Sequence, residues 1–323
     1  MSDYWLGIDL GGTNLKFGLL DDKLRLVGTM QLPTPASEGF EGVVAQMVRG
    51  AGRLIGREGI EPKRVKAVGI GAPGPLKISE GIVVAMPNIP GMENAPLGER
   101  LGDELGMPAV LENDANAAAL GEYLCGAGKG SGNMVLLTLG TGIGSGIIVE
   151  GKILHGSHEM GGEMGHTIIV PDGEQCNCGQ KGCLERYCSA TYMVMRARRR
   201  LEGGQIRSAL SDIPGGISEL TARDIHRACV NGDAFAREVW LEAIHYLAIG
   251  CVNICRILDP DKIVLGGGMT AAGDDLIVPL RESVACLHWS ITPLRTAVEI
   301  ASLGNDAGVI GSAGAAWQEF NRK

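Results

Sequence analysis

The chain has 323 residues, of which 45% are hydrophobic and 20% are charged. This composition is typical of a globular protein, and the length suits two lobes of roughly 100–200 residues each. No uninterrupted apolar run reaches the roughly 18 residues of a membrane-spanning helix. The first residues, Met1 to Tyr4, include an acid and lead directly into a strand-like segment, which does not resemble a signal peptide. We therefore expect a cytoplasmic protein that does not bind membranes.

The net charge of −8 argues against nucleic-acid binding, because such binding depends on Lys and Arg side chains that neutralise phosphates. The densest basic run is Arg196–Arg200. Met193, Ala197 and Leu201 fall on one face of a helical pattern through this run, so we interpret the arginines as the solvated face of a helix. We expect no nucleic-acid partner.

The first predicted elements form a β-hairpin whose turn is rich in glycine. Trp5–Asp9 and Leu15–Leu20 are apolar strands on either side of Gly11–Thr13. Alternating helices and strands follow. We predict a helix over Ala45–Ile55, strands over Val65–Gly71 and Ala109–Leu111, and an alanine-rich helix over Asn116–Leu124.

A second hairpin of the same kind begins the other half of the chain. Val135–Thr138 and Ser145–Val149 surround Gly140–Gly142, and Leu139-Gly140 repeats Leu10-Gly11 at an offset of 129 residues. This similarity suggests a duplicated domain. The sequence therefore predicts an α/β fold with two lobes and a cleft between them.

The longest predicted helix runs from Asp233 to Leu258 in the second half. Asp233 can cap its start, and Asp259-Pro260 ends it. Its expected buried stripe consists of Phe235, Val239, Ala243, Leu247, Cys251, Ile254 and Leu258. A strand over Lys262–Leu265 then leads into Gly266, Gly267 and Gly268.

The glycine turns match neither the P-loop nor the dinucleotide-binding fingerprint. They instead suit a hairpin turn whose backbone N–H groups face anionic oxygens. Asp9 could hold Mg²⁺ through water, and Thr13 and Thr141 supply hydroxyl donors. The simpler alternative is a pair of tight turns that use glycine for its positive φ. Two such turns, each with a threonine, favour phosphate binding.

An acidic residue lies where a predicted strand meets the alanine-rich helix. Asp114 could accept the proton of a hydroxyl group during phosphoryl transfer, since a helix N-terminus favours the ionised carboxylate. The alternative is that Asp114 is only the N-cap of that helix.

One histidine and three cysteines form the most specific motif. His166, Cys176, Cys178 and Cys183 follow one another at spacings of ten, two and five residues. They supply the four ligands of a tetrahedral structural zinc site. The alternative, a loop with free thiols, is less favoured because the three thiols lie within eight residues among turn-forming residues.

Three segments resemble the phosphate and adenosine loops of the actin-like ATPase and sugar-kinase superfamily. These are Asp9–Asn14, Leu139–Gly146 and Leu265–Met269. Within that superfamily the chain resembles the ROK family over essentially its whole length, and the zinc spacing is similar too. The resemblance implies two ribonuclease-H-like lobes. We expect residues 1–117 and 308–323 in the N-terminal lobe, and 118–307 in the C-terminal lobe, with a zinc-binding loop at 163–185.

The resemblance also implies roles for individual residues. Asp114 is the expected catalytic base, and His166 is both a zinc ligand and a sugar ligand. The expected sugar-binding residues are Asn88, Asn113, Asp114, Glu163, His166 and Glu185. The expected ATP- and Mg²⁺-binding residues are Asp9, Gly11, Gly12, Thr13, Asn14, Lys16, Gly140, Thr141, Gly142, Gly266, Gly267 and Gly268. Met92 stands where many family glucokinases have tryptophan, a departure that bears on the sugar rather than on the kinase chemistry.

The implied activity is ATP-dependent phosphorylation of glucose by a homodimer or homotetramer. N-acetylmannosamine, N-acetylglucosamine, fructose and allose are alternative substrates, because a single substituent changes discrimination by only about 1–3 kcal/mol. A sugar-responsive repressor is less favoured, because the family's repressors carry a helix-turn-helix domain ahead of the first hairpin, where this chain has about four residues, and because the net charge is −8. A silent sugar-binding protein is also less favoured, because Asp114 and the phosphate loops are present.

Overall fold

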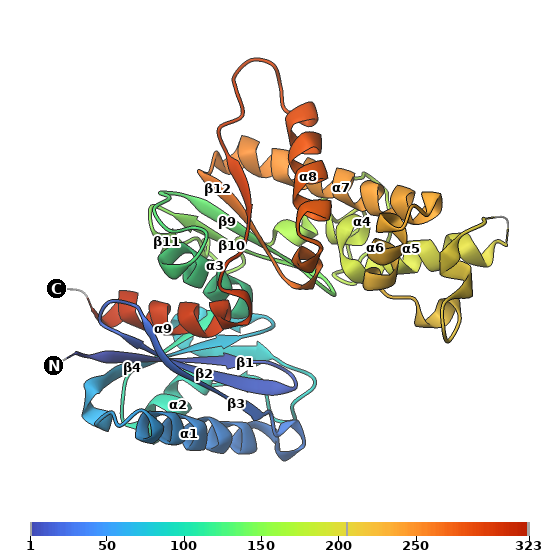
Figure 1. Cartoon of the computed structure of the whole chain (residues 1–323). Helices are drawn as coiled ribbons and strands as arrows, with labels where there is room; N and C mark the ends of the chain where they lie inside the picture. The colour runs from blue at the N-terminus through green and yellow to red at the C-terminus, as the bar shows by residue number, and fades with distance from the viewer. Residues whose placement is uncertain (1, 205, 322–323) are drawn as a thin grey trace. The chain divides into compact units, whose positions relative to one another are not determined.

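The computed structural model describes residues 2–204 and 206–321 (Figure 1). Contacts divide the chain into two compact units. Unit 1 comprises Met1–Gly132, Gly146–Gly162 and Ser302–Lys323, and unit 2 comprises Asn133–Ser145 and Glu163–Ala301. This boundary lies later in the chain than the expected one after residue 117, and the segment 146–162 returns to unit 1. Of the residues assigned to the predicted lobes, Met1, Gln205, Arg322 and Lys323 lie outside the described residues.

Two five-stranded sheets have the same strand order. The first is β3 (Leu26–Pro33), β2 (Asn14–Asp21), β1 (Tyr4–Leu10), β4 (Val65–Ala72) and β8 (Ala109–Asn113). The second is β11 (Lys152–Ile153), β10 (Ile143–Val149), β9 (Met134–Leu139), β12 (Lys262–Gly266) and β13 (Ala297–Ile300). Counted along the chain within each sheet, both run third, second, first, fourth, fifth strand. The predicted duplication is therefore confirmed. A small third sheet contains β5 (Leu76–Lys77), β6 (Ile82–Ala85) and β7 (Glu93–Ala95).

Four helices belong to unit 1 and five to unit 2 in the described part of the chain. In unit 1 they are α1 (Gly39–Arg57), α2 (Leu97–Leu105), α3 (Asp114–Cys125) and α9 (Ala307–Phe320). In unit 2 they are α4 (Glu185–Cys188), α5 (Ala190–Glu202), α6 (Ala222–Val230), α7 (Ala234–Leu258) and α8 (Asp274–Leu287). Helix α1 begins earlier than predicted, because burial of Val43 and Val44 outweighs the low helix propensity of the glycines around them.

Helix α7 has the predicted limits but a broader buried face. The Asp233 side chain caps it by accepting the Ala236 N–H at 2.8 Å. The predicted stripe is buried except for Leu258, which is only half-buried, and Trp240 and Ile244 are buried as well. By length and apolar composition α7 could cross a membrane, as the core helices of globular proteins also can. Here it packs against α6 and α8 (Figure 1).

The basic run lies on α5, as predicted, but two of its arginines do not belong to a solvated face. Arg196 donates hydrogen bonds to the carbonyls of Arg186 and Tyr187 at 2.7 and 2.6 Å. Arg198 donates to the carbonyl of Leu220 at 2.7 Å. The interpretation as a wholly solvated face is therefore wrong for Arg196 and Arg198, which hold neighbouring segments of unit 2 together.

In unit 1, helices α1 and α2 cover one face of the first sheet and α9 covers the other (Figure 1). Strand β1 alternates accordingly. Leu6 and Ile8 pack in the core with α1, whereas Trp5 packs with α9. Glycines allow α9 to approach other backbone segments closely. A methyl group on Gly69 of β4 would lie 1.7 Å from the Ser312 carbonyl oxygen, and one on Gly311 would lie 1.5 Å from the Ala117 carbonyl oxygen of α3.

We expect Gly311→Ala to destabilise the protein by about 1–3 kcal/mol, because backbone atoms on both sides must separate to admit the methyl group. Gly52→Ala in α1 is the matched control. Gly52 is exposed and has no heavy atom within 4 Å of an added methyl group, so this change should raise stability by about 0.5–1 kcal/mol. Urea denaturation followed by circular dichroism measures both. Equal effects of the two substitutions would contradict the close packing of α9 against α3.

Candidate functional site

The first predicted phosphate loop is the turn between β1 and β2. The Gly11 N–H donates to the Asn14 carbonyl at 3.0 Å, which closes the turn. Gly12 and Thr13 are exposed at its tip. The Thr34 hydroxyl donates to the Gly11 carbonyl at 2.7 Å and ties the turn to the end of β3. The turn therefore has a fixed backbone and an exposed tip, as a phosphate-binding turn requires.

Asp9 and Lys16 lie directly opposite each other at the base of this turn. Burial raises the pKa of the Asp9 carboxyl group, and the nearby Lys16 ammonium partly offsets this effect. Lys16 also donates to the Asn305 carbonyl at 3.3 Å. A methyl group on Gly308 would lie 2.9 Å from the Asp9 carboxylate, so Asp9 contacts the first turn of α9. A half-buried carboxylate beside a phosphate turn has the chemistry that Mg²⁺ prefers.

The predicted base Asp114 is the first residue of α3, and the cap of that helix is Asn113. The Asn113 amide oxygen accepts the N–H groups of Ala115 at 2.9 Å and Asn116 at 3.2 Å. The alternative that Asp114 is only an N-cap is therefore wrong. The exposed Asp114 carboxylate accepts the Ala115 N–H at 2.8 Å, which fixes its orientation at the helix start. The cap uses only the oxygen of the Asn113 amide, so its NH₂ group is still able to donate.

A buried carboxylate lies directly behind this turn. Glu112 is 2% exposed and accepts hydrogen bonds from the Asn113 N–H and the Asn116 side-chain amide, both at 2.9 Å. Its other oxygen lies 2.7 Å from Nε2 of His155. The hydrogen bond to Glu112 raises the pKa of His155. Sequence analysis missed both residues, since His155 follows β11, about forty positions away from Glu112 in the chain.

Asn88, the remaining predicted sugar ligand of unit 1, lies in a loop that follows β6. Backbone hydrogen bonds between Met86 and Met92 and between Ile89 and Met86 hold the loop closed. Asn88 is exposed at its tip, whereas Met92 is 1% exposed and belongs to the core of unit 1.

The second predicted phosphate loop is the turn between β9 and β10. The Gly140 N–H donates to the Gly142 carbonyl at 3.0 Å, and Thr141 is exposed at the tip. The predicted sugar ligand Glu185 lies against this turn. Its carboxylate accepts the Ile143 N–H at 2.8 Å, and a methyl group on Gly142 would lie 2.3 Å from the same carboxylate. Unit 2 therefore brings the second phosphate turn and Glu185 together.

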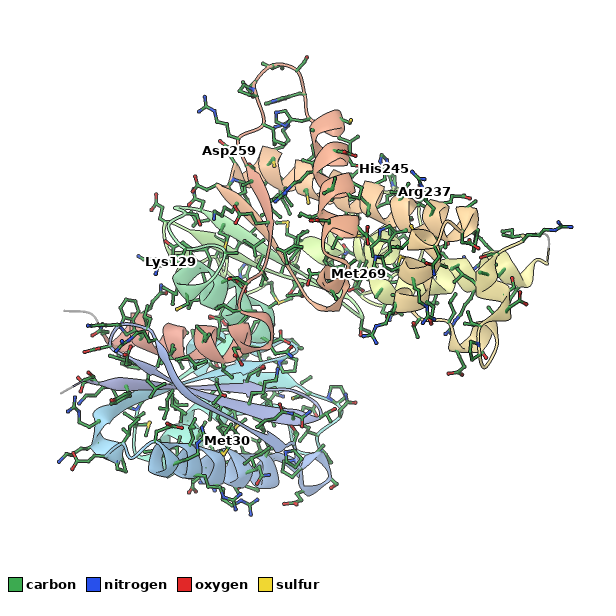
Figure 2. All side chains as sticks on the ribbon, in the orientation of Figure 1. Met30, Lys129, Arg237, His245, Asp259 and Met269 are labelled. Atoms are coloured by element: carbon green, nitrogen blue, oxygen red, sulfur yellow. The ribbon has the colours of Figure 1, made fainter. Side chains whose placement is uncertain are left out.

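The predicted adenosine loop also meets the second phosphate turn. Gly267 follows β12 with φ of 87°, a backbone conformation that favours glycine. A methyl group there would lie 2.5 Å from the Leu139 carbonyl oxygen, just before Gly140. Gly267 and Gly268 are exposed, whereas Met269, labelled in Figure 2, is 7% exposed and anchors the loop.

The four predicted zinc ligands come together in unit 2. One donor atom from each of His166, Cys176, Cys178 and Cys183 lies within 4.8 Å of all the others. Nδ1 of His166 is 3.8 Å from the Cys176 sulfur, and the sulfurs of Cys178 and Cys183 are 3.6 Å apart. Zn–S bonds of about 2.3 Å arranged tetrahedrally give sulfur separations of about 3.8 Å. The donor set and its spacing therefore fit a structural zinc ion.

Backbone pairing connects this cluster to the predicted sugar ligands. An isolated bridge pairs Ile168 with Cys183, and the Leu184 N–H donates to the Thr167 carbonyl at 2.9 Å. The chain just after His166 therefore lies beside the chain just before Glu185. Glu163 is exposed one turn earlier, before the 3₁₀ helix Met164–His166.

Sequence analysis missed Gln180, which lies among the ligands. Its side-chain amide donates to the His166 carbonyl at 3.1 Å and lies 3.5 Å from the Cys178 sulfur and 3.6 Å from the Cys183 sulfur. Its position between Cys178 and Cys183 in the chain is the only signal that the sequence gives.

Comparison with known proteins agrees with this geometry. The ROK family profile matches residues 5–319. The chain belongs to the ROK family. A glucokinase from Halalkalibacterium halodurans is 37% identical, with 99% of this chain and 97% of the relative covered. The ROK hexokinase structure from Thermus thermophilus is 33% identical, with a TM-score of 0.83 and coverage of 98% of this chain and 99% of that chain.

A ROK glucokinase from Streptomyces griseus, solved with glucose and AMPPNP, is also 33% identical, with a TM-score of 0.78 and coverage of 98% and 99%. This ROK protein therefore has the predicted α/β fold of the actin-like ATPase superfamily, with two lobes built on repeated sheets.

Proposed function

We propose that this ROK protein transfers the γ-phosphoryl group of ATP to the 6-hydroxyl group of glucose, with Asp114 as the general base. The observation that carries the proposal is that Asn113 caps α3, so the exposed Asp114 carboxylate is not required as the cap. The glucokinases and the hexokinase to which the chain is similar support both the reaction and the sugar.

In the proposed reaction, Asp114 accepts the proton of the sugar hydroxyl as its oxygen bonds to the γ-phosphorus. The bond between that phosphorus and the β,γ-bridging oxygen breaks, and ADP leaves. The exposed turns at Gly11–Asn14 and Gly140–Gly142 would bind the phosphates through N–H and hydroxyl groups. Asp9, with Lys16 beside it, would hold Mg²⁺, which when bound neutralises charge on the phosphate oxygens. Gly266–Gly268 would contact the adenosine.

We assign recognition of the sugar hydroxyls to Asn88, Asn113 and Asp114 of unit 1 and to Glu163, His166 and Glu185 of unit 2. Carboxylates suit this role because each accepts more than one hydroxyl hydrogen bond. Within unit 2 the Ile143 N–H holds the Glu185 carboxylate in place, so this ligand has a fixed orientation before the sugar binds.

Zinc bound by His166, Cys176, Cys178 and Cys183 would be structural, because four protein ligands leave no position for a water molecule. His166 would bind it through Nδ1, the nitrogen that faces Cys176, and direct Nε2 at a sugar hydroxyl. The cluster would also fix the chain that precedes Glu185.

We further propose a homodimer or homotetramer in the cytoplasm. Ile168 and Ile257 in unit 2 are 54% and 67% exposed and line one cavity of about 220 Å³, which suits burial against another copy of the chain. The nine cysteines are all unpaired, which suits the reducing cytoplasm.

A coupled assay for ADP release with a panel of hexoses tests the proposal. We expect Mg²⁺-ATP-dependent turnover, with kcat/KM higher for glucose than for fructose, allose, N-acetylmannosamine or N-acetylglucosamine. Omission of the sugar and addition of EDTA are the controls. A higher kcat/KM for one of the other sugars would mean that this sugar, and not glucose, is the preferred substrate. Absence of turnover with every sugar of the panel would overturn the kinase proposal.

We expect Asp114→Asn to lower kcat by about 10²–10⁴-fold, since it removes the base while preserving the shape of the side chain. Glucose binding, measured by calorimetry, should persist. Asp103→Asn on α2, an exposed acid outside the proposed site, is the control. Wild-type kcat in Asp114→Asn would mean that the base is another group.

We expect Cys178→Ala to lose zinc and to weaken glucose binding more than nucleotide binding. Its side chain contacts Cys183 and Gln180 within the cluster, so we expect an effect on the sugar to act through His166 and Glu185. Elemental analysis gives the zinc content, and calorimetry gives the two affinities. Cys286→Ala, which changes an exposed thiol outside the cluster, should change none of these values. A zinc-free Cys178→Ala protein with wild-type glucose affinity would show that glucose binding does not depend on the metal.

A further inference from the structure

We propose that Glu112, held by His155, is a positioning residue that fixes Asn113 and the base Asp114 at the start of α3. This inference rests on the proposed role of Asp114. Glu112 and His155 lie behind the turn, and neither belongs to the sugar or nucleotide ligands assigned above.

The contacts of Glu112 form a closed ring around the turn that carries Asp114. One carboxylate oxygen accepts the Asn113 N–H and the Asn116 side-chain amide, both at 2.9 Å. The Asn113 side chain in turn accepts the Asn116 N–H at 3.2 Å. Asp114 lies between these two asparagines in the chain. Its backbone is therefore held on both sides through the same carboxylate.

His155 satisfies the second oxygen of Glu112. A carboxylate with 3% of its side chain exposed needs a partner for each oxygen, because an unpaired buried charge is strongly destabilising. Nε2 of His155 meets this need at 2.7 Å. The raised pKa of His155 agrees with a charge-assisted hydrogen bond to Glu112.

His155 belongs to a segment of the chain that is separate from the turn before α3. It follows β11 and lines a cavity of about 1100 Å³ in unit 1, which Glu112 also reaches. Its imidazole is 34% exposed, so a substitution there disturbs less packing than one at Glu112 itself. The two residues can therefore be tested separately.

Loss of these hydrogen bonds from Glu112 should affect the catalytic rate more than the binding of the substrate. Displacing a catalytic group by about 1 Å can cost on the order of 10²-fold in rate, whereas ligands on other segments continue to bind the sugar. If Glu112 had only a structural role, its substitution would lower stability and leave kcat per folded molecule unchanged.

Glu122 provides the matched control. It is a second buried glutamate, 0% exposed and on α3 itself, and its carboxylate accepts the backbone N–H groups of Ala127, Ser302 and Leu303. It therefore anchors backbone as Glu112 does, but at the other end of the helix and without contact to Asn113.

The experiment measures kcat, KM for glucose and ATP, and melting temperature for Glu112→Gln, Glu122→Gln, His155→Leu and His155→Gln. Glu112→Gln and His155→Leu should lower kcat by about tenfold or more and raise KM for glucose by a smaller factor, since Asn113 and Asp114 are two of the six proposed sugar ligands. His155→Gln retains a side-chain N–H donor for Glu112 and should recover most of kcat. Glu122→Gln should lower the melting temperature and keep wild-type kcat.

Wild-type kcat in both Glu112→Gln and His155→Leu would overturn the inference. An equal loss of kcat in Glu122→Gln would overturn it as well, since any buried carboxylate that anchors an end of α3 would then have the same effect. Asp114→Asn measured in parallel separates this result from the base assignment. If Asp114→Asn is inactive while Glu112→Gln is not, the base stands and the positioning role fails. If Asp114→Asn retains kcat, the base assignment itself fails.

Discussion

The close approach of α9 to the first sheet and to α3 is the constraint on which unit 1 depends. Backbone atoms meet at Gly69 and Gly311 at separations that exclude even a methyl group. This packing places the first turn of α9 beside Asp9 and holds α3 by its backbone. The predicted phosphate turn and the proposed base both belong to elements that α9 contacts, so these close backbone contacts help to set their positions.

Buried carboxylates fix the segments at the two ends of α3. Glu112 binds the turn before α3, and Glu122 binds the segments that follow α3 and precede α9. A buried charge is costly unless every oxygen is satisfied, so these groups hold their partners in one arrangement. The C-terminal segment returns to unit 1 partly through Glu122, which joins residues about 180 positions apart in the chain.

In unit 2, a cluster of cysteine and histidine side chains, rather than a buried carboxylate, lies where distant segments meet. Its sugar-binding candidates lie in a region with little regular secondary structure, where short 3₁₀ turns and isolated bridges alternate. One imidazole and three sulfurs from different parts of this region come together in a cluster, and the Gln180 side chain lies among them. The Glu185 carboxylate then reaches the turn between β9 and β10, so the proposed sugar-binding and phosphate-binding segments of unit 2 share one contact.

The sequence alone determined features that depend on neighbours in the chain. The glycine turns, the cap of α7 by Asp233 and the spacing of the four proposed zinc ligands are local patterns with local physical causes. The repeated hairpins also predicted the duplicated sheet, since both halves carry the same turn signal. The resemblance to the ROK family rested on the same local motifs and was confirmed over residues 5–319.

Only the tertiary structure decided what distant residues do to one another. His155 lacked a partner in the sequence because Glu112 lies about forty residues away, and the two meet only when β8 and the segment after β11 fold into unit 1. The sequence pattern placed Arg196 on a solvated helix face, whereas in the structure it donates hydrogen bonds to the carbonyls of Arg186 and Tyr187. Asp114 was ambiguous for the same reason. A cap is defined by the hydrogen bonds that form, and the folded chain gives them to Asn113.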